Sequence, residues 1–203
     1  MEKINYDRKY KEIISTFNDK PKLLLHACCG PCSSYVLEYL SNNFEITVLF
    51  YNPNIYPEEE YLKRKNELLK LIKLMNKSNI SYEDIDYLSN EYDEKIINLE
   101  NEPEGGKRCY ECIYLRLQKT AILAKEGSFE YFCTTLTVSP HKNAEMINRI
   151  GEELSKEYDI KYLYSDFKKN EGFKKSIENS KKYDLYRQNY CGCKYSMRKE
   201  ENE

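Results

Sequence analysis

The sequence predicts an α/β fold, a mostly parallel sheet flanked by helices. Short apolar runs rich in β-branched and aromatic residues alternate with longer amphipathic segments, which is the pattern of strands joined by crossover helices. No internal repeat or linker interrupts this alternation. A single domain over 1–203 is therefore expected, closed by a basic helix and a Tyr-rich CGC segment over about 165–203.

In the first half of the chain, apolar periodicity and charge at the helix ends define the predicted elements. KLLLHA is a short apolar run typical of a buried parallel strand. The helix after it is entered through Pro31, which suits a first helical turn. The segment 58–76 begins with acidic residues and has lysine near its end, as the helix dipole favours. The predicted elements are a helix over 3–17, a strand over 22–27, a helix over 33–40, a strand over 44–51 and a helix over 58–76.

The second half of the chain repeats the alternation. The loop NEPEGGKR leads to Cys109 and Cys112 at the beginning of a helix that Gly127 ends. A basic helix and a Tyr-rich loop close the chain. The predicted elements are a strand over 80–86, a helix over 90–99, a helix over 112–126, a strand over 129–135, a helix over 144–157 and a strand over 161–164.

Composition and charge limit the functional classes. The N-terminus alternates charged with apolar residues and lacks the apolar core of a signal peptide, and no apolar run approaches the ~20 residues that cross a bilayer. A cytoplasmic protein without a membrane partner is expected. The net charge of −2 does not by itself indicate a nucleic-acid binder. The Lys-rich segment 161–182 is either a solvated helix face or a surface that contacts phosphates.

The cysteines are the strongest functional signal. All eight except Cys133 fall into three tight groups, CCGPC at 28–32, CYEC at 109–112 and CGC at 191–193. Cytosolic thiols are kept reduced, so clustered cysteines in that compartment bind metal or carry out redox chemistry. CCGPC directly follows the first strand, and ligands of parallel sheets bind beyond the carboxyl ends of the strands. Cys133 lies inside an apolar strand and is expected to be a buried structural residue.

Spacing alone leaves the chemistry of these groups open. CGPC resembles a thioredoxin active site, two CxxC pairs could hold zinc, and soft thiolates also suit an iron–sulfur cluster. Cys191 and Cys193 would close a small, strained disulfide ring of the readily reduced kind, but they could also be cluster ligands. A non-enzymatic zinc-binding module and a thioredoxin-like thiol–disulfide oxidoreductase remain alternatives.

Five segments taken together resemble one family. HACCGPCSS, FYNPNIYPEEEYLKR, GKRCYECIYLRL, FCTTLTVSPHKN and YRQNYCGC, in this order and covering roughly 23–193, are similar to the QueH family of epoxyqueuosine reductases. The resemblance implies the last step of queuosine biosynthesis, the reduction of epoxyqueuosine to queuosine at the wobble position of a tRNA. It also implies a [4Fe-4S] cluster, no cobalamin, and a sheet similar to the PP-loop (HUP-type) fold. Because CCGPCSS takes the place of the phosphate loop of PP-loop enzymes, no use of ATP is expected.

The resemblance also implies roles for the cysteines. Carried over by position, Cys28, Cys29, Cys109 and Cys112 would hold the cluster, and CGC at 191–193 would be the redox-active pair, with Cys191 and Cys193 as catalytic residues. An iron of the cluster, or a second iron held partly by Cys32, would act on the epoxide oxygen as a Lewis acid. An external electron donor, which the sequence does not name, must recycle the enzyme.

Basic and aromatic side chains beside the cysteines are candidates for substrate binding. An anticodon loop is bound by aromatic rings that stack on bases and by cations that contact phosphates. Tyr186 and Arg187 precede the CGC segment, Arg116 follows the second cysteine group, and His141 follows Pro140 just before a predicted helix. These four residues are the expected contacts of the tRNA substrate.

Overall fold

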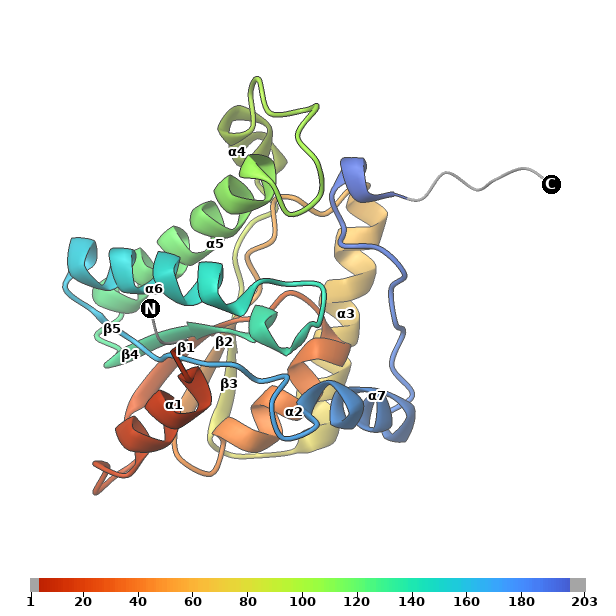
Figure 1. Cartoon of the computed structure of the whole chain (residues 1–203). Helices are drawn as coiled ribbons and strands as arrows, with labels where there is room; N and C mark the ends of the chain where they lie inside the picture. Colours follow the sequence, from red (N-terminus) through yellow and green to blue (C-terminus); the bar gives the residue numbers. More distant parts are fainter. Residues whose placement is uncertain (1–3, 198–203) are drawn as a thin grey trace.

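The computed structural model describes residues 4–197 and contains a five-stranded parallel sheet with helices on both faces (Figure 1). The strand order is β3-β2-β1-β4-β5, and every neighbouring pair is parallel. The predicted fold class is thus confirmed. The strands are β1 (Lys22–His26), β2 (Glu45–Leu49), β3 (Ile80–Glu83), β4 (Tyr131–Thr134) and β5 (Lys161–Tyr162). The helices are α1 (Tyr6–Ile14), α2 (Gly30–Leu40), α3 (Glu58–Met75), α4 (Ser89–Lys95), α5 (Lys107–Glu126), α6 (Ala144–Tyr158) and α7 (Gly172–Lys182), with short 3-10 turns η1 (Thr135–Val138) and η2 (Lys194–Ser196).

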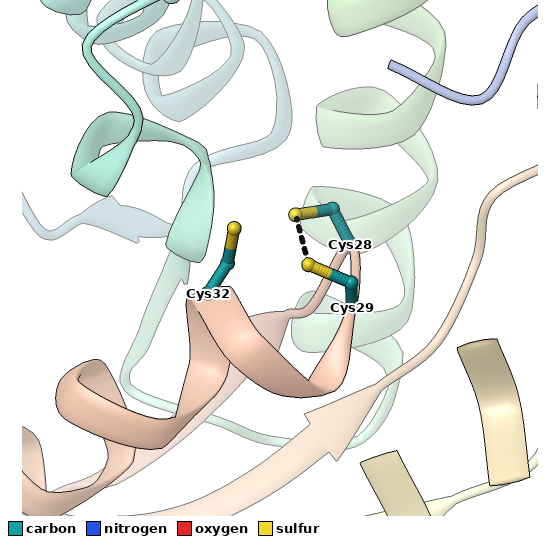
Figure 2. A group of neighbouring side chains, drawn as sticks. All are labelled: Cys28, Cys29 and Cys32. Atoms are coloured by element: carbon teal, nitrogen blue, oxygen red, sulfur yellow. Dashed lines mark hydrogen bonds between the residues drawn. The ribbon is translucent and has the colours of Figure 1, made fainter. Parts of the chain in front are cut away.

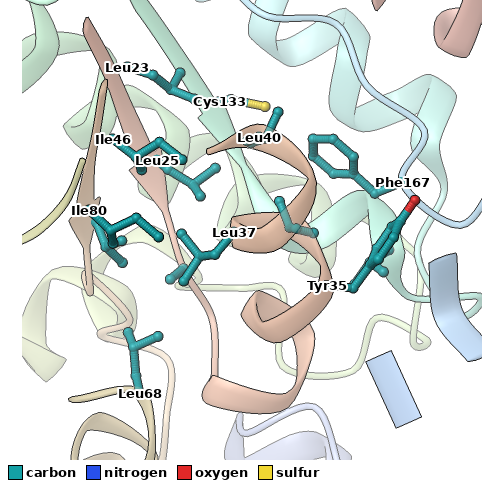
Figure 3. Close-up of a cluster of buried hydrophobic side chains, with 14 of the residues drawn as sticks. Leu23, Leu25, Tyr35, Leu37, Leu40, Ile46, Leu68, Ile80, Cys133 and Phe167 are labelled. Carbon is teal, nitrogen blue, oxygen red and sulfur yellow. The ribbon is translucent and has the colours of Figure 1, made fainter. Parts of the chain in front are cut away.

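The two faces of the sheet carry separate hydrophobic cores. Alternate residues of β1 point to opposite faces, because successive side chains of a strand alternate. Leu23 and Leu25 join the core beneath α1, α2 and α3 (Figure 3), whereas Leu24 packs with apolar residues of α5 and α6. All three leucines are fully buried. The sheet is therefore covered on both sides, and its functional surface lies at the edges of the strands.

The strand order places a switch point at the centre of the sheet. After β1 the chain proceeds through β2 to β3 on one side, and it then returns to the other side to form β4 and β5. The loops that leave β1 and β4 therefore diverge, which opens a crevice at the carboxyl ends of these two strands. CCGPC begins in the loop after β1, and η1 follows β4 directly. The sequence prediction that these segments meet at one edge is confirmed.

The boundaries of the elements differ from the predictions in physically clear ways. Helix α5 begins at Lys107, so Cys109 and Cys112 lie inside its first two turns. Helix α4 ends at Lys95, before the predicted Leu99, and the nearby Asn98 has a left-handed φ of 66° that no helix continues. Strand β4 stops at Thr134, whose hydroxyl accepts a hydrogen bond from the amide of Leu136 and starts η1.

None of the described helices combines the length and the apolar character that crossing a membrane requires.

Candidate functional site

The thiols of Cys28, Cys29 and Cys32 form a compact triad at the beginning of α2 (Figure 2). Their sulfur atoms all lie within 4.8 Å of one another, and those of Cys28 and Cys29 are 3.7 Å apart. Cys29 caps the helix and Cys32 lies one turn further, so helical geometry itself brings the thiols together. The triad is a group of soft ligands that suits zinc or iron.

The residues between the triad cysteines fix its position. Pro31 occupies the first turn of α2, where a missing N–H costs nothing. A Cβ at Gly30 would lie 3.0 Å from the backbone oxygen of Glu67, so glycine favours the close approach of α2 to α3. On the side of β4, the hydroxyl of Thr135 accepts a hydrogen bond from the amide of Cys28 at 3.4 Å. The triad is thus anchored at the switch point.

One thiolate dominates the electrostatics of the triad. Hydrogen bonds from Cys29 and Cys32 hold the pKa of the Cys28 thiol well below its ordinary value. The hydrogen bond to Cys28 in turn raises the pKa values of the Cys29 and Cys32 thiols. The three thiols therefore share their protons, and Cys28 is the first to ionise.

The remaining clustered cysteines form a second group. Cys109, Cys112, Cys191 and Cys193 line one small cavity of about 10 Å³ between α5 and the C-terminal segment. The amide of Gly105 donates a hydrogen bond to the sulfur of Cys109 at 3.2 Å. Burial raises the pKa of the Cys112 thiol to about 11. All eight cysteines are thiols.

Arg116 lies between the two cysteine groups. Its side chain is buried, donates to the backbone oxygen of Cys112 at 3.0 Å, and lines the cavities of both groups. Within residues 4–197, no carboxylate lies within ion-pair distance of its guanidinium. Burial alone would lower the pKa of Arg116, but Coulombic interactions with Cys112, Cys191 and Cys28 raise it above its ordinary value. Because the pKa of Cys28 is lowered whereas that of Cys112 is raised, the Cys28 thiolate is the sulfur that balances this buried cation.

A larger cavity of about 370 Å³ opens beside the triad. Cys28 and Cys32 contribute to its wall, and Cys191 faces it from the C-terminal segment. Of the candidate substrate contacts, Arg116, His141 and Arg187 line this cavity, whereas Tyr186 is not part of its lining. The hydroxyl of Tyr186 instead donates a hydrogen bond to Glu60, and its ring lies beneath Lys63.

Arg64 of α3 holds the CGC segment in place. Its guanidinium donates hydrogen bonds to the backbone oxygens of Cys191 at 3.1 Å and Tyr190 at 3.3 Å, and it forms an ion pair with Glu60 at 2.6 Å. The amide of Tyr56 donates to the oxygen of Gly192 at 2.8 Å. The side chain of Arg64 is only 2% exposed, so it is a buried anchor. Sequence reasoning missed this role, although Arg64 ends one of the motif segments.

Replacing Gly192 with alanine is expected to displace the CGC segment. Gly192 has a φ of 118°, and a Cβ there would lie 2.9 Å from the guanidinium of Arg64. Misplacement by about 1 Å can cost 10²-fold in rate, so we expect turnover to fall by about 10-fold to 100-fold, measured as kcat. Gly105→Ala is the matched control, because Gly105 also has a positive φ but a Cβ there would meet no other part of the chain within 4 Å. Equal loss in both variants would show that the contact with Arg64 has no role.

Two further residues have structural roles. His26 is fully buried, and its ring nitrogens contact the hydroxyl of Thr134 at 2.8 Å and the backbone oxygen of Tyr51 at 3.1 Å. Burial lowers the pKa of His26 to about 4, so its ring is neutral. Cys133 is fully buried and donates to the backbone oxygen of Leu163, which confirms its predicted burial.

The fold and the site define an α/β protein with a thiol-lined cavity at the switch point of a parallel sheet. Comparison with known proteins narrows this class. Residues 23–199 match the model of the family described as epoxyqueuosine reductase QueH, and the chain belongs to this family. An epoxyqueuosine reductase QueH of Streptococcus pyogenes serotype M1 is 44% identical over 97% of this chain and 80% of its own length. Proteins of the same description from Acinetobacter baylyi and Thermotoga maritima are 42% and 34% identical, over 87% and 86% of this chain and 81% and 90% of their own lengths.

Proposed function

We propose that this protein reduces epoxyqueuosine to queuosine in tRNA, and that it works in the cytoplasm. The observation that carries the proposal is the grouping of seven thiols around the switch point in a chain that belongs to the QueH family. Removing an epoxide oxygen as water and leaving an alkene consumes two electrons and two protons. Oxidation of two thiols to one disulfide releases two electrons and two protons, so the reaction balances with a single cysteine pair.

Cys191 and Cys193 are the proposed redox pair. They are separated by one glycine, and Cys191 faces the larger cavity. Arg64 of α3 holds the backbone oxygen of Cys191 by a hydrogen bond. After each turnover, an external electron donor must return the disulfide to two thiols. The cavity of about 370 Å³ that holds Cys191 is the proposed site for the modified base.

A metal group is the proposed second component. Cys28 and Cys29 of the triad with Cys109 and Cys112 of α5 are the proposed ligands of a [4Fe-4S] cluster, and Cys32 is the candidate ligand of a second iron. The donor set supports this assignment, because thiolates are the ligands that iron–sulfur clusters require and the buried Arg116 lies near thiols of both groups. When bound, the cluster would provide a group through which electrons can pass and an acidic iron near the cavity.

The residues of the chain would orient the substrate in this cavity. His141 and Arg187 line its wall and offer hydrogen bonds to a nucleotide. The guanidinium of Arg187 is itself held by the hydroxyl of Ser180 at 2.9 Å, which limits its motion. Phe173, at the beginning of α7, offers an apolar surface to the same cavity. Tyr186 remains a proposed contact of the tRNA outside the cavity.

The metal content tests this proposal. The protein is purified without oxygen, and iron, zinc and acid-labile sulfide are measured per chain. About four iron and four sulfide are expected for the cluster, and additional iron would support the second metal. Zinc without sulfide would contradict the proposed reductase and favour a zinc-binding module. A stable metal-free protein would also contradict it and would favour a thioredoxin-like oxidoreductase.

Helix α7 is the proposed contact with the tRNA backbone. Lys174 and Lys175 are exposed and follow Phe173 at the cavity. Replacing both with alanine is expected to weaken tRNA binding and to reduce the slope of log affinity against log salt by about 1 per lysine, because each phosphate contact releases counterions. The measurement is the dissociation constant across a salt series. Lys156→Ala, on α6 at the other face of the sheet, is the control and should leave the slope unchanged; tRNA binding that is independent of salt would contradict this prediction.

A further inference from the structure

The two cysteines of the CGC segment lie in different surroundings. Cys191 is half-buried and lines the larger cavity. Cys193 is 6% exposed and packs in an apolar cluster with Tyr92 and Ile96. The thiol of Cys193 donates to the hydroxyl of Ser196 at 3.4 Å. Only Cys191 therefore presents its sulfur to a molecule in the cavity.

A lysine reaches the sulfur of Cys191. The Nζ atom of Lys142 donates to this sulfur at 3.1 Å, and Lys142 also lines the larger cavity. In the described part of the chain, no carboxylate lies within ion-pair distance of Lys142, so the Cys191 sulfur is the partner of its ammonium. A neighbouring ammonium favours the thiolate over the thiol, and the thiolate is the reactive form of cysteine.

Both ends of this contact are fixed by the fold. Lys142 immediately precedes Asn143, which caps α6 by accepting a hydrogen bond from Met146, and the backbone oxygen of Lys142 accepts a hydrogen bond from Lys168 at 3.3 Å. The backbone of Cys191 is held by Arg64 at 3.1 Å. The direction of the Cys191 sulfur toward the cavity is thus set by two cations from separate elements.

We propose that Lys142 is a positioning residue that holds the Cys191 sulfur toward the cavity, which makes Cys191 the first of the two cysteines to react and Cys193 its buried partner. This inference rests on the proposed redox pair. In the overall balance each thiol gives up one proton and one electron, one S–S bond forms, and the epoxide oxygen leaves as water.

Thiol alkylation tests the inference without using turnover. The protein with its metal, kept reduced and free of oxygen, is treated with iodoacetamide at one neutral pH, and fragment-ion mass spectrometry separates labelling of Cys191 from that of Cys193. The cysteine sulfur forms the new S–C bond and iodide leaves. We expect Cys191 to react before Cys193. We expect Lys142→Gln to slow the labelling of Cys191 about tenfold or more, because a neighbouring lysine ammonium activates a cysteine as a nucleophile.

Two further variants distinguish an effect of the charge on Lys142 from a structural effect of its replacement. Lys142→Arg keeps a cation and should retain most of the Cys191 rate, which a merely structural role would not explain. Lys169→Gln removes an exposed lysine of the same segment that does not line the cavity, and it should leave the rate unchanged. Labelling of Cys193 first in the unaltered protein, or equal Cys191 rates with and without the Lys142 ammonium, would overturn the inference. Ordered labelling in a protein that cannot reduce epoxyqueuosine would uphold the inference and refute the proposed function instead.

Discussion

Cys28→Ser is expected to remove the metal centre, with iron and sulfide per chain falling to near zero and turnover lost with them. Cys28 lies at the switch point, within 4.8 Å of two further thiols. It is the member of the triad whose pKa its neighbours hold lowest, so it is the first thiolate available to a metal. A serine hydroxyl stays protonated at neutral pH and is a poor ligand for iron. Metal analysis of protein purified without oxygen measures the effect.

Cys133→Ser is the matched control for this prediction. Cys133 is also a buried cysteine of the central sheet, but its sulfur donates to the backbone oxygen of Leu163 at 3.3 Å and to no other cysteine. A hydroxyl can make the same hydrogen bond, so we expect the metal content to be unchanged and the melting temperature to shift by only a few degrees. Full iron in Cys28→Ser, or equal loss of iron in Cys133→Ser, would show that the triad does not hold the metal.

Cys191→Ser and Cys193→Ser are each expected to abolish turnover while leaving the metal content intact. A single thiol cannot form the intramolecular disulfide that supplies two electrons, so we expect kcat to fall by about 10³-fold or more in either variant. The buried Cys193 is as necessary as the half-buried Cys191, because the S–S bond needs both sulfur atoms. The measurement is the single-turnover yield of reduced nucleoside together with iron per chain.

The metal content of these two variants decides between alternative roles. Both cysteines line the small cavity that also contains Cys109 and Cys112. Loss of iron in Cys191→Ser or Cys193→Ser would therefore place the affected residue among the metal ligands, and the redox-pair assignment would be wrong. Near-normal turnover in either variant would contradict the proposed two-electron balance directly.

The sheet could be predicted from the sequence because its signals are local. Apolar runs such as KLLLHA and the capped amphipathic helices depend on neighbouring residues, and parallel connectivity follows from their alternation. The triad was foreseeable for the same reason, since Cys29 and Cys32 are one helical turn apart. Element ends were less predictable; the end of α4 at Lys95, three residues before the left-handed Asn98, carries no strong local signal.

The contacts between distant segments could not be predicted. Lys142 and Cys191 are 49 residues apart, and Arg64 is 127 residues from the carbonyl that it holds. Many of the 32 basic residues are solvated, and composition does not tell which few turn inward. Tyr186 illustrates the reverse case, since an aromatic residue beside the CGC segment lies outside the cavity lining. Only the packed tertiary structure distinguishes these residues.

Conversion of epoxyqueuosine in tRNA is the most direct test of the central claim. The reduced, metal-containing protein is incubated without oxygen with tRNA that carries epoxyqueuosine and with a chemical electron donor, and the digested nucleosides are analysed by mass spectrometry. The account predicts that the modified nucleoside loses the mass of one oxygen atom, and that Cys191→Ser stops this change. Unchanged epoxyqueuosine after incubation with protein that contains iron, sulfide and reduced thiols would contradict it.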